Sequence, residues 1–216
     1  MCFHVVVTNC TFEHNGPVTV FKQEQYRGSA AGISIGYDDN HYNTESGTPI
    51  ESVPDGAGSV SVTNCTFQNN KHTPITDQQV NTHNFFSRYV FPGRGGALSV
   101  TVNSSFPFNA NFTDCIIEDN LAQSFGGGFY IVYSGYSEHL TVVSNSRFAG
   151  GHAQDGGGGG LVVAFVEAGR RESFNVRLEV YNSNFANNSA VFGGGIFFLA
   201  GRKLHNMQVY VLIRCV

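Results

Sequence analysis

Two neighbouring aspartates with a histidine close behind them form the arrangement in this chain that could do acid–base chemistry. They are Asp38 and Asp39, with His41 following. Two positioned carboxyl groups can cleave a glycosidic bond, because one protonates the leaving oxygen while the other activates a water molecule. If the chain is an enzyme, Asp38, Asp39 and His41 are therefore the catalytic candidates of a lyase or hydrolase that acts on polysaccharides.

A solvated acidic loop is the alternative interpretation of these residues, and we favour it. Equivalent places further along the chain carry Asn103, Ser134, Glu167 and Gly201, so no second acidic pair stands beside the first. We therefore expect a non-catalytic role rather than an enzymatic one.

Charged residues in these segments could instead form a binding surface. The candidates are two acidic and four basic residues, namely Asp38, Asp39, Arg170, Arg171, Arg202 and Lys203. If the apolar runs before them stack in register, the loops gather along one side of the molecule, where glycans or surface proteins are the expected partners. In the alternative, insertions are tolerated there and their charge keeps the protein soluble.

Other kinds of chemistry have no matching pattern in the sequence. The glycine run at 156–160 has no helical pattern after it, whereas a phosphate-binding loop opens a helix. No CxxC, HxH or HExxH spacing occurs, so we expect no metal and no cofactor. The chain has 12 basic and 16 acidic residues, and the basic ones form no stripe, so we expect no nucleic-acid partner.

An internal repeat supplies the elements that must position these residues. Five segments share one frame, and glycine and a second apolar run follow each of them. The segments are VVVTNCTFEHN (5–15), VSVTNCTFQNN (60–70), NFTDCIIEDN (111–120), TVVSNSRFAGG (141–151) and LEVYNSNFANN (178–188). A repeat that tolerates insertions at fixed points is typical of a solenoid, in which stacked copies share one core.

Side-chain ladders follow if the copies stack. Val60 and Val62 alternate inward, Asn64 intervenes, and Cys65 and Phe67 then point inward, so two short strands meet at a corner. Stacking places like residues about 4.8 Å apart. We predict a corner ladder of Asn9, Asn64, Asp114, Asn145 and Asn182, and an apolar ladder of Phe12, Phe67, Ile117, Phe148 and Phe185. A second polar ladder would contain Asn15, Asn70, Asn120 and Asn188, with Gly151 in the remaining copy.

These residues resemble a known repeat. An FxxN element stands at 12–15, 67–70 and 185–188, and glycine-rich elements stand at 95–98 and 194–196. Together they resemble the FxxN and GGA[ILV] repeat of the chlamydial polymorphic outer membrane proteins, and the general pattern is similar to pectin-lyase-like β-helix regions. The resemblance covers nearly the whole chain, with Ile117 and Gly151 as departures. It implies a right-handed parallel β-helix in a secreted or cell-surface protein, often an adhesin.

We therefore expect a single all-β domain over 1–216, a right-handed parallel β-helix of about five to six coils with loop insertions. Its expected role is that of a non-catalytic extracellular or cell-surface scaffold for adhesion or interaction. Strand patterns reach both ends of the chain, which predicts a fragment of a longer repeat protein without its end caps, next to neighbouring repeats of the same polypeptide. No apolar run approaches the roughly 20 residues of a membrane helix.

Cysteines and sequons add two smaller expectations. Cys10 and Cys65 share one repeat position with Cys115, and we interpret them as small buried apolar residues, because stacked side chains strain a disulfide. The glycosylation candidates are Asn103, Asn111 and Asn187, of which Asn103 is expected on a loop.

Overall fold

The computed structural model describes residues 3–16, 32–38, 58–72, 94–104, 106–134, 137–166, 175–200 and 208–214. Every regular element in these residues is a β-strand, which confirms the predicted all-β fold. Within this part of the chain, no helix is long and apolar enough to cross a membrane.

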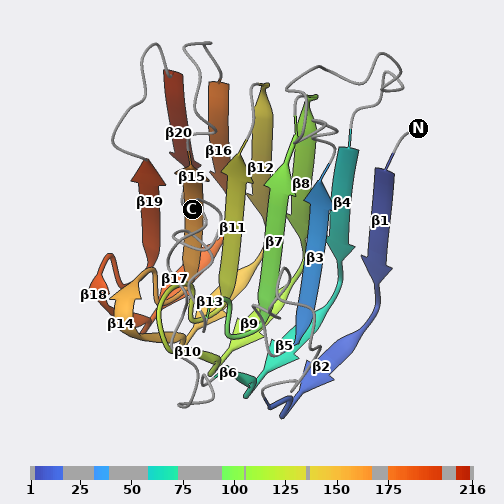
Figure 1. Ribbon diagram of the computed structural model, residues 1–216. Coiled ribbons are helices and arrows are strands. Elements are labelled where there is room, and N and C mark those ends of the chain that lie inside the picture. Colours follow the sequence, from blue (N-terminus) through green and yellow to red (C-terminus); the bar gives the residue numbers. More distant parts are fainter. Residues whose placement is uncertain are drawn as a thin grey trace, which may run out of the picture.

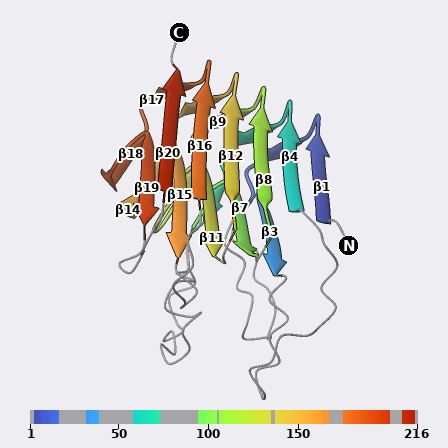
Figure 2. The same cartoon turned by 90° about the horizontal axis from the view of Figure 1, so that it is seen from above.

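The strands form four parallel sheets that run along the molecule (Figures 1 and 2). Sheet 1 consists of β1 (Phe3–Thr8), β4 (Gly58–Thr63), β8 (Phe108–Thr113), β12 (His139–Ser144), β16 (Asn175–Tyr181) and β20 (Gln208–Arg214). Sheet 2 consists of β2 (Thr11–Glu13), β5 (Thr66–Gln68), β9 (Ile116–Glu118), β13 (Arg147–Ala149) and β17 (Asn184–Ala186). Sheet 3 consists of β6 (Lys71–His72), β10 (Leu121–Ala122), β14 (His152–Gly157) and β18 (Ser189–Phe192). Sheet 4 consists of β3 (Ile33–Asp38), β7 (Leu98–Asn103), β11 (Phe129–Ser134), β15 (Leu161–Val166) and β19 (Ile196–Ala200).

Successive repeats supply neighbouring strands, and like positions lie opposite one another. Val62 of β4 lies between Val7 of β1 and Phe112 of β8, for example. Sheet 3 was not predicted from the sequence, which indicated only two short strands and one later apolar run in each repeat. Its strands β6 and β10 have two residues each, too few to show an alternating pattern.

The chain turns between sheets 1 and 2 and again between sheets 2 and 3, and residues in the left-handed region make both of these turns. At the first corner the φ angles are 55° (Asn9), 52° (Asn64), 55° (Asp114), 50° (Asn145) and 46° (Asn182). At the second corner the equivalent residues are His14, Asn69, Asp119, Gly150 and Asn187. Asn, Asp and Gly tolerate this conformation better than other residues, which explains their recurrence at these positions.

Aromatic rings fill the core between the sheets. Phe12 stacks on Phe67 with 4.9 Å between ring centroids, and Phe148 stacks on Phe185 at 4.6 Å. Between these pairs Ile117 takes the place of a phenylalanine in the register. Phe129 of sheet 4 contacts Phe67 and Phe148 edge-on, at 5.3 and 5.2 Å. One ring from another sheet thus links the two stacked pairs.

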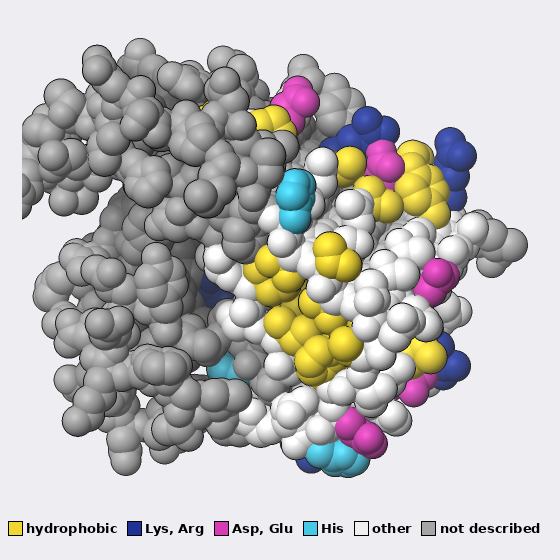
Figure 3. Space-filling model, turned by 90° about the vertical axis from the view of Figure 1, so that its right-hand side faces the viewer, with side chains coloured by type: hydrophobic (Ala, Val, Ile, Leu, Met, Phe, Trp, Pro, Cys, Tyr) yellow, Lys and Arg dark blue, Asp and Glu magenta, His cyan; other side chains and the backbone are white. Residues whose placement is uncertain are grey.

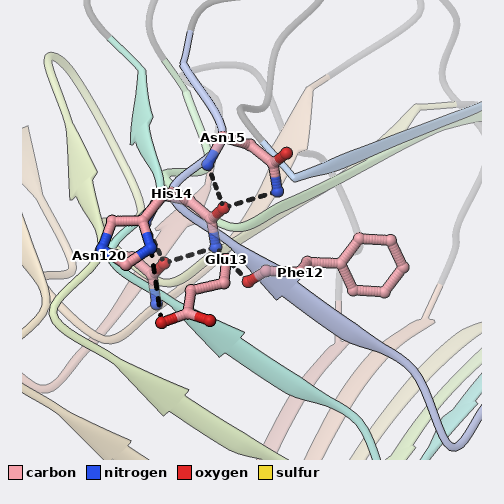
Figure 4. A network of polar contacts seen from close by, with 6 residues as sticks. Phe12, Glu13, His14, Asn15 and Asn120 are labelled. Atoms are coloured by element: carbon pink, nitrogen blue, oxygen red, sulfur yellow. Dashed lines mark hydrogen bonds and ion pairs between the residues drawn. The ribbon is translucent and has the colours of Figure 1, made fainter.

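A buried asparagine ladder lies beside these rings (Figure 4). The Asn15 side-chain amide donates to Asn70 Oδ1 at 2.9 Å, and the Asn70 amide donates to Asn120 Oδ1 at 2.9 Å. The amides of Asn70 and Asn120 also donate to the carbonyl oxygens of Phe12 and Phe67 in the preceding repeats. The Asn70 side chain therefore has partners in the repeats on both sides of it.

Core side chains of the first repeat are less buried than those of the interior repeats. Val5, Val7, Cys10, Phe12 and Ile33 are only partly buried, although they pack against the main core. Figure 3 shows apolar side chains gathered in the middle of this N-terminal end. The core is thus open at the end of the stack that β1 and β2 form.

Candidate functional site

Strand ends of sheet 4 and strand starts of sheet 1 line up along one edge of the molecule. In sheet 4, Asn103 lies opposite both Asp38 and Ser134. In sheet 1, Phe108 lies opposite His139. The segments that join the two sheets therefore leave and return along a common edge.

A hollow of about 260 Å³ opens on the outer side of sheet 1 near this edge. Residues at or near the starts of β8, β12 and β16 line it, namely Pro107, Asn109, Glu138, His139, Leu140, Asn175 and Arg177. Asn109, Leu140 and Arg177 lie opposite one another in adjacent strands and form one row across its floor. We call this hollow the lateral groove.

The charges of the lateral groove are already partnered within the sheet. Glu138 Oε1 accepts a hydrogen bond from Asn175 Nδ2 at 3.0 Å. Arg177 forms an ion pair with Glu179, which also accepts a hydrogen bond from the Tyr181 hydroxyl at 2.6 Å. This hydrogen bond raises the pKa of Tyr181. An anionic ligand would therefore have to compete with Glu179 for the guanidinium group.

His139 borders the lateral groove, but its ring lies in the core. The residue is 1% exposed, and the imidazole stacks on Tyr133 with 4.8 Å between ring centroids. Neither ring nitrogen has a hydrogen-bond partner in the structure. Burial lowers the pKa of His139 to about 4, so the ring is neutral at neutral pH. Because its neighbours in the register are Phe108 and Val176, a polar residue here stands out only once the repeats are aligned.

The rest of the outer side of sheet 1 continues from the lateral groove toward β1, and we call the whole surface the sheet 1 face. Its side chains form three rows, which are His4, Ser59, Asn109, Leu140 and Arg177, then Val6, Ser61, Asn111, Val142 and Glu179, then Thr8, Thr63, Thr113, Ser144 and Tyr181. Along β1, β4, β8 and β12 the only ionisable member is His4, whose Nδ1 is hydrogen-bonded to Ser59 Oγ at 2.7 Å. Over these four strands the surface is polar and nearly uncharged.

The outer side of sheet 4 has the opposite character. Tyr130, Val132, Val162 and Ala164 point outward there and are nevertheless buried. Arg94 lies against this apolar cluster, 4.8 Å from the ring centroid of Tyr130, and donates a hydrogen bond to its hydroxyl at 2.6 Å. Ligands therefore have no access to these four side chains, whereas the sheet 1 face is open.

The charged residues predicted for catalysis and binding fall almost entirely outside the described residues. This holds for Asp39, His41, Arg170, Arg171, Arg202 and Lys203. Asp38 is the last residue of β3, where it lies opposite Asn103. The lateral groove is formed by other residues, which the sequence analysis did not identify. The three residues across its floor come from three repeats and differ in type, so no recurring pattern marks them.

The sequons lie in three different settings. Asn103 is the last residue of β7, in register with Asp38 and Ser134, which corrects the expectation that it lies on a loop. The pairing of β7 with β11 runs over six residues and ends with Asn103 opposite Ser134. Asn111 is half-buried in the second row of the sheet 1 face, and Asn187 is exposed at the second corner.

Cys10, Cys65 and Cys115 are free thiols that occupy one position of the repeat. Each donates from its sulfur to the carbonyl oxygen two residues earlier, at 3.2, 3.3 and 3.3 Å respectively. Burial raises the pKa of Cys115 to about 11, which keeps it protonated and unreactive at neutral pH. Within the described residues, no three His, Cys, Asp or Glu side chains lie close enough together to hold a metal ion.

Comparison of the chain with protein-family models, with curated proteins and with solved structures gives no match.

Proposed function

We propose that this chain is a right-handed parallel β-helix of about five to six coils that serves as a non-catalytic scaffold and binds glycans or surface proteins along one side. The in-register stacking of repeats in four parallel sheets supports the β-helix. The same stacking explains how a short repeat builds a long, regular surface.

The lateral groove is the observation that carries the binding role. It is concave, it lies on the side where the chain crosses between sheets 4 and 1, and polar side chains surround an apolar floor at Leu140. Ligand sites generally combine a concave apolar surface with a few polar groups that fix orientation.

An extracellular or cell-surface location is part of the proposal. The resemblance of the repeat to that of the polymorphic outer membrane proteins supports it, as does the exposed sequon at Asn187. A scaffold that displays a regular side to other molecules fits this location.

Binding to a panel of immobilised glycans and purified surface proteins tests the proposal. We expect binding that Leu140→Lys weakens at least tenfold, because the new side chain fills the lateral groove. Gln154→Lys places the same side chain at an exposed position of β14 and should leave binding unchanged. If nothing in the panel binds, or if both variants bind as the unmodified chain does, the proposed function is wrong.

Product analysis of every bound polysaccharide separates a scaffold from an enzyme. We expect each ligand to be recovered intact. Cleavage that Asp38→Asn and Asp39→Asn abolish would instead establish a polysaccharide-active enzyme and would return these residues to the catalytic role considered above.

A further inference from the structure

We infer that the sheet 1 face binds an uncharged polysaccharide whose chain lies along the stack, parallel to the rows of hydroxyl and amide side chains and over the lateral groove. This inference rests on the proposed binding function and specifies the ligand of that site. It adds a chemical class, an orientation and a set of contact residues.

The chemistry of the rows matches sugar hydroxyl groups. The third row begins with Thr8, Thr63, Thr113 and Ser144, four hydroxyl side chains in succession. A hydroxyl group is both a donor and an acceptor, so it can pair with a sugar hydroxyl in either sense. Asn111 in the second row adds an amide with the same double capacity.

The charge distribution selects against anionic ligands. The guanidinium group of Arg177 is paired with Glu179, and both lie on β16 rather than on the strands nearer to β1. A polyuronate would find no unpaired cation along β1, β4, β8 and β12, where His4 is the only ionisable outward side chain. A neutral chain meets no such mismatch.

The geometry favours an extended, regular ligand. Parallel strands repeat about every 4.8 Å, so a chain along the stack meets equivalent side chains at successive repeats. The hydrogen bond of 3.0 Å between Thr113 Oγ1 and Ser144 Oγ holds neighbouring hydroxyl groups in place before a ligand arrives. Each contact is weak, but several contacts made by one chain act together, so affinity should rise with chain length.

The lateral groove supplies the concave part of the site. Its volume of about 260 Å³ lies below the roughly 300–1,000 Å³ of pockets that enclose a whole drug-sized ligand. It therefore suits a single sugar ring of a longer chain. Leu140 and Pro107 can contact the C–H groups of this ring, while Asn109 and Asn175 offer amides to its hydroxyl groups.

Calorimetric titration of the whole chain with defined oligosaccharides tests the inference. The probes are the neutral hexasaccharides cellohexaose, xylohexaose, mannohexaose and maltohexaose, the matching disaccharides, and hexagalacturonate as a charged chain of equal length. We expect at least one neutral hexasaccharide to bind tenfold or more tightly than its disaccharide and than hexagalacturonate.

Paired Thr→Val substitutions identify the surface that makes the contacts. Thr63→Val combined with Thr113→Val removes two hydroxyl groups of the third row but keeps the branched shape, and should weaken hexasaccharide binding about tenfold. Thr66→Val makes the same change on the outer side of β5 in sheet 2 and should change affinity less than twofold. Thermal unfolding of each variant shows that it is folded.

The possible failures can be told apart. If hexagalacturonate or surface proteins bind but no neutral hexasaccharide does, the inference is wrong while the proposed function stands. If no probe and no member of the panel binds, both are wrong. If a neutral hexasaccharide binds and only Leu140→Lys weakens it, the lateral groove acts alone and the contact rows are wrong.

Discussion

Asn120 and His139 belong to adjacent repeats and are each 1% exposed, yet their surroundings differ. The amide of Asn120 donates to the Phe67 carbonyl oxygen at 2.9 Å, and its oxygen accepts from both the backbone and the side chain of Asn70. The imidazole of His139 has no hydrogen bond and stacks on Tyr133. A buried polar group is costly unless it is paired, so the same degree of burial should stabilise the fold at Asn120 and weaken it at His139.

The largest loss of stability is expected from removing the hydrogen bonds of Asn120. Asn120→Ala removes three hydrogen bonds and leaves the Asn70 backbone N–H buried without an acceptor, so the free energy of unfolding should fall by about 3 kcal/mol or more. Denaturant titration measures this loss. The matched control is Asn109→Ala at an exposed position in β8 of the same repeat, where the change should stay within about 0.5 kcal/mol. Equal effects at both positions would contradict a structural role of the ladder.

Acid should weaken the fold through His139. Its folded-state pKa of about 4 lies below the ordinary value of 6.5, so the unfolded chain binds the proton more readily. The stability of the native state is therefore complete above pH 6.5 and declines as the pH falls from 6.5 toward 4, by about 3 kcal/mol in all. The other ionisable groups nearby are Glu138 and Arg177 beside the lateral groove and Tyr133 beneath the ring.

Denaturant titrations between pH 7 and pH 4 on the unmodified chain and on His139→Phe isolate this contribution. The substituted chain should lose about 3 kcal/mol less stability over the same range, since every other titrating group is shared. Parallel pH profiles for the two proteins would show that His139 is not buried in its neutral form.

At neutral pH a smaller gain is expected from His139→Phe. Phenylalanine can keep the stacking on Tyr133, it occupies the equivalent place in β8 as Phe108, and it removes two unpaired nitrogen atoms from the core. We expect the free energy of unfolding at pH 7 to rise by about 1 kcal/mol. His152→Phe is the control, because His152 is exposed and its Nδ1 is hydrogen-bonded to Ser189 Oγ at 2.7 Å. A gain of equal size there would assign the effect to general hydrophobicity rather than to the unpaired imidazole.

Aligning the repeats in the sequence was enough to anticipate much of this core. The frame that aligns Phe12 with Phe67 pairs the same residues that sheet 2 pairs, because residue types recur wherever stacked side chains meet. The strands of sheet 3 could not be anticipated, since two residues such as Lys71 and His72 carry no period. The lateral groove was missed for a related reason. Asn109, Leu140 and Arg177 share a row but no residue type, so only the register brings them together.

The smallest change in stability is expected at the first corner of the repeat. Its side-chain amides are hydrogen-bonded to one another like those of the buried ladder, but they are exposed to water. The Asn64 side chain donates to Asn9 Oδ1 at 2.7 Å, but both residues are exposed, so water replaces a lost partner. What the corner requires is a residue that tolerates the φ of 52° at Asn64. Asn64→Gly keeps this conformation and should change the free energy of unfolding by no more than about 0.5 kcal/mol, whereas Asn64→Ala should cost about 1 kcal/mol through backbone strain. Denaturant titration of both variants separates the loss of the hydrogen bond from the backbone strain. A loss in the glycine variant as large as that in Asn120→Ala would contradict this expectation, because the exposed hydrogen bond would then stabilise the fold as strongly as the buried ladder does.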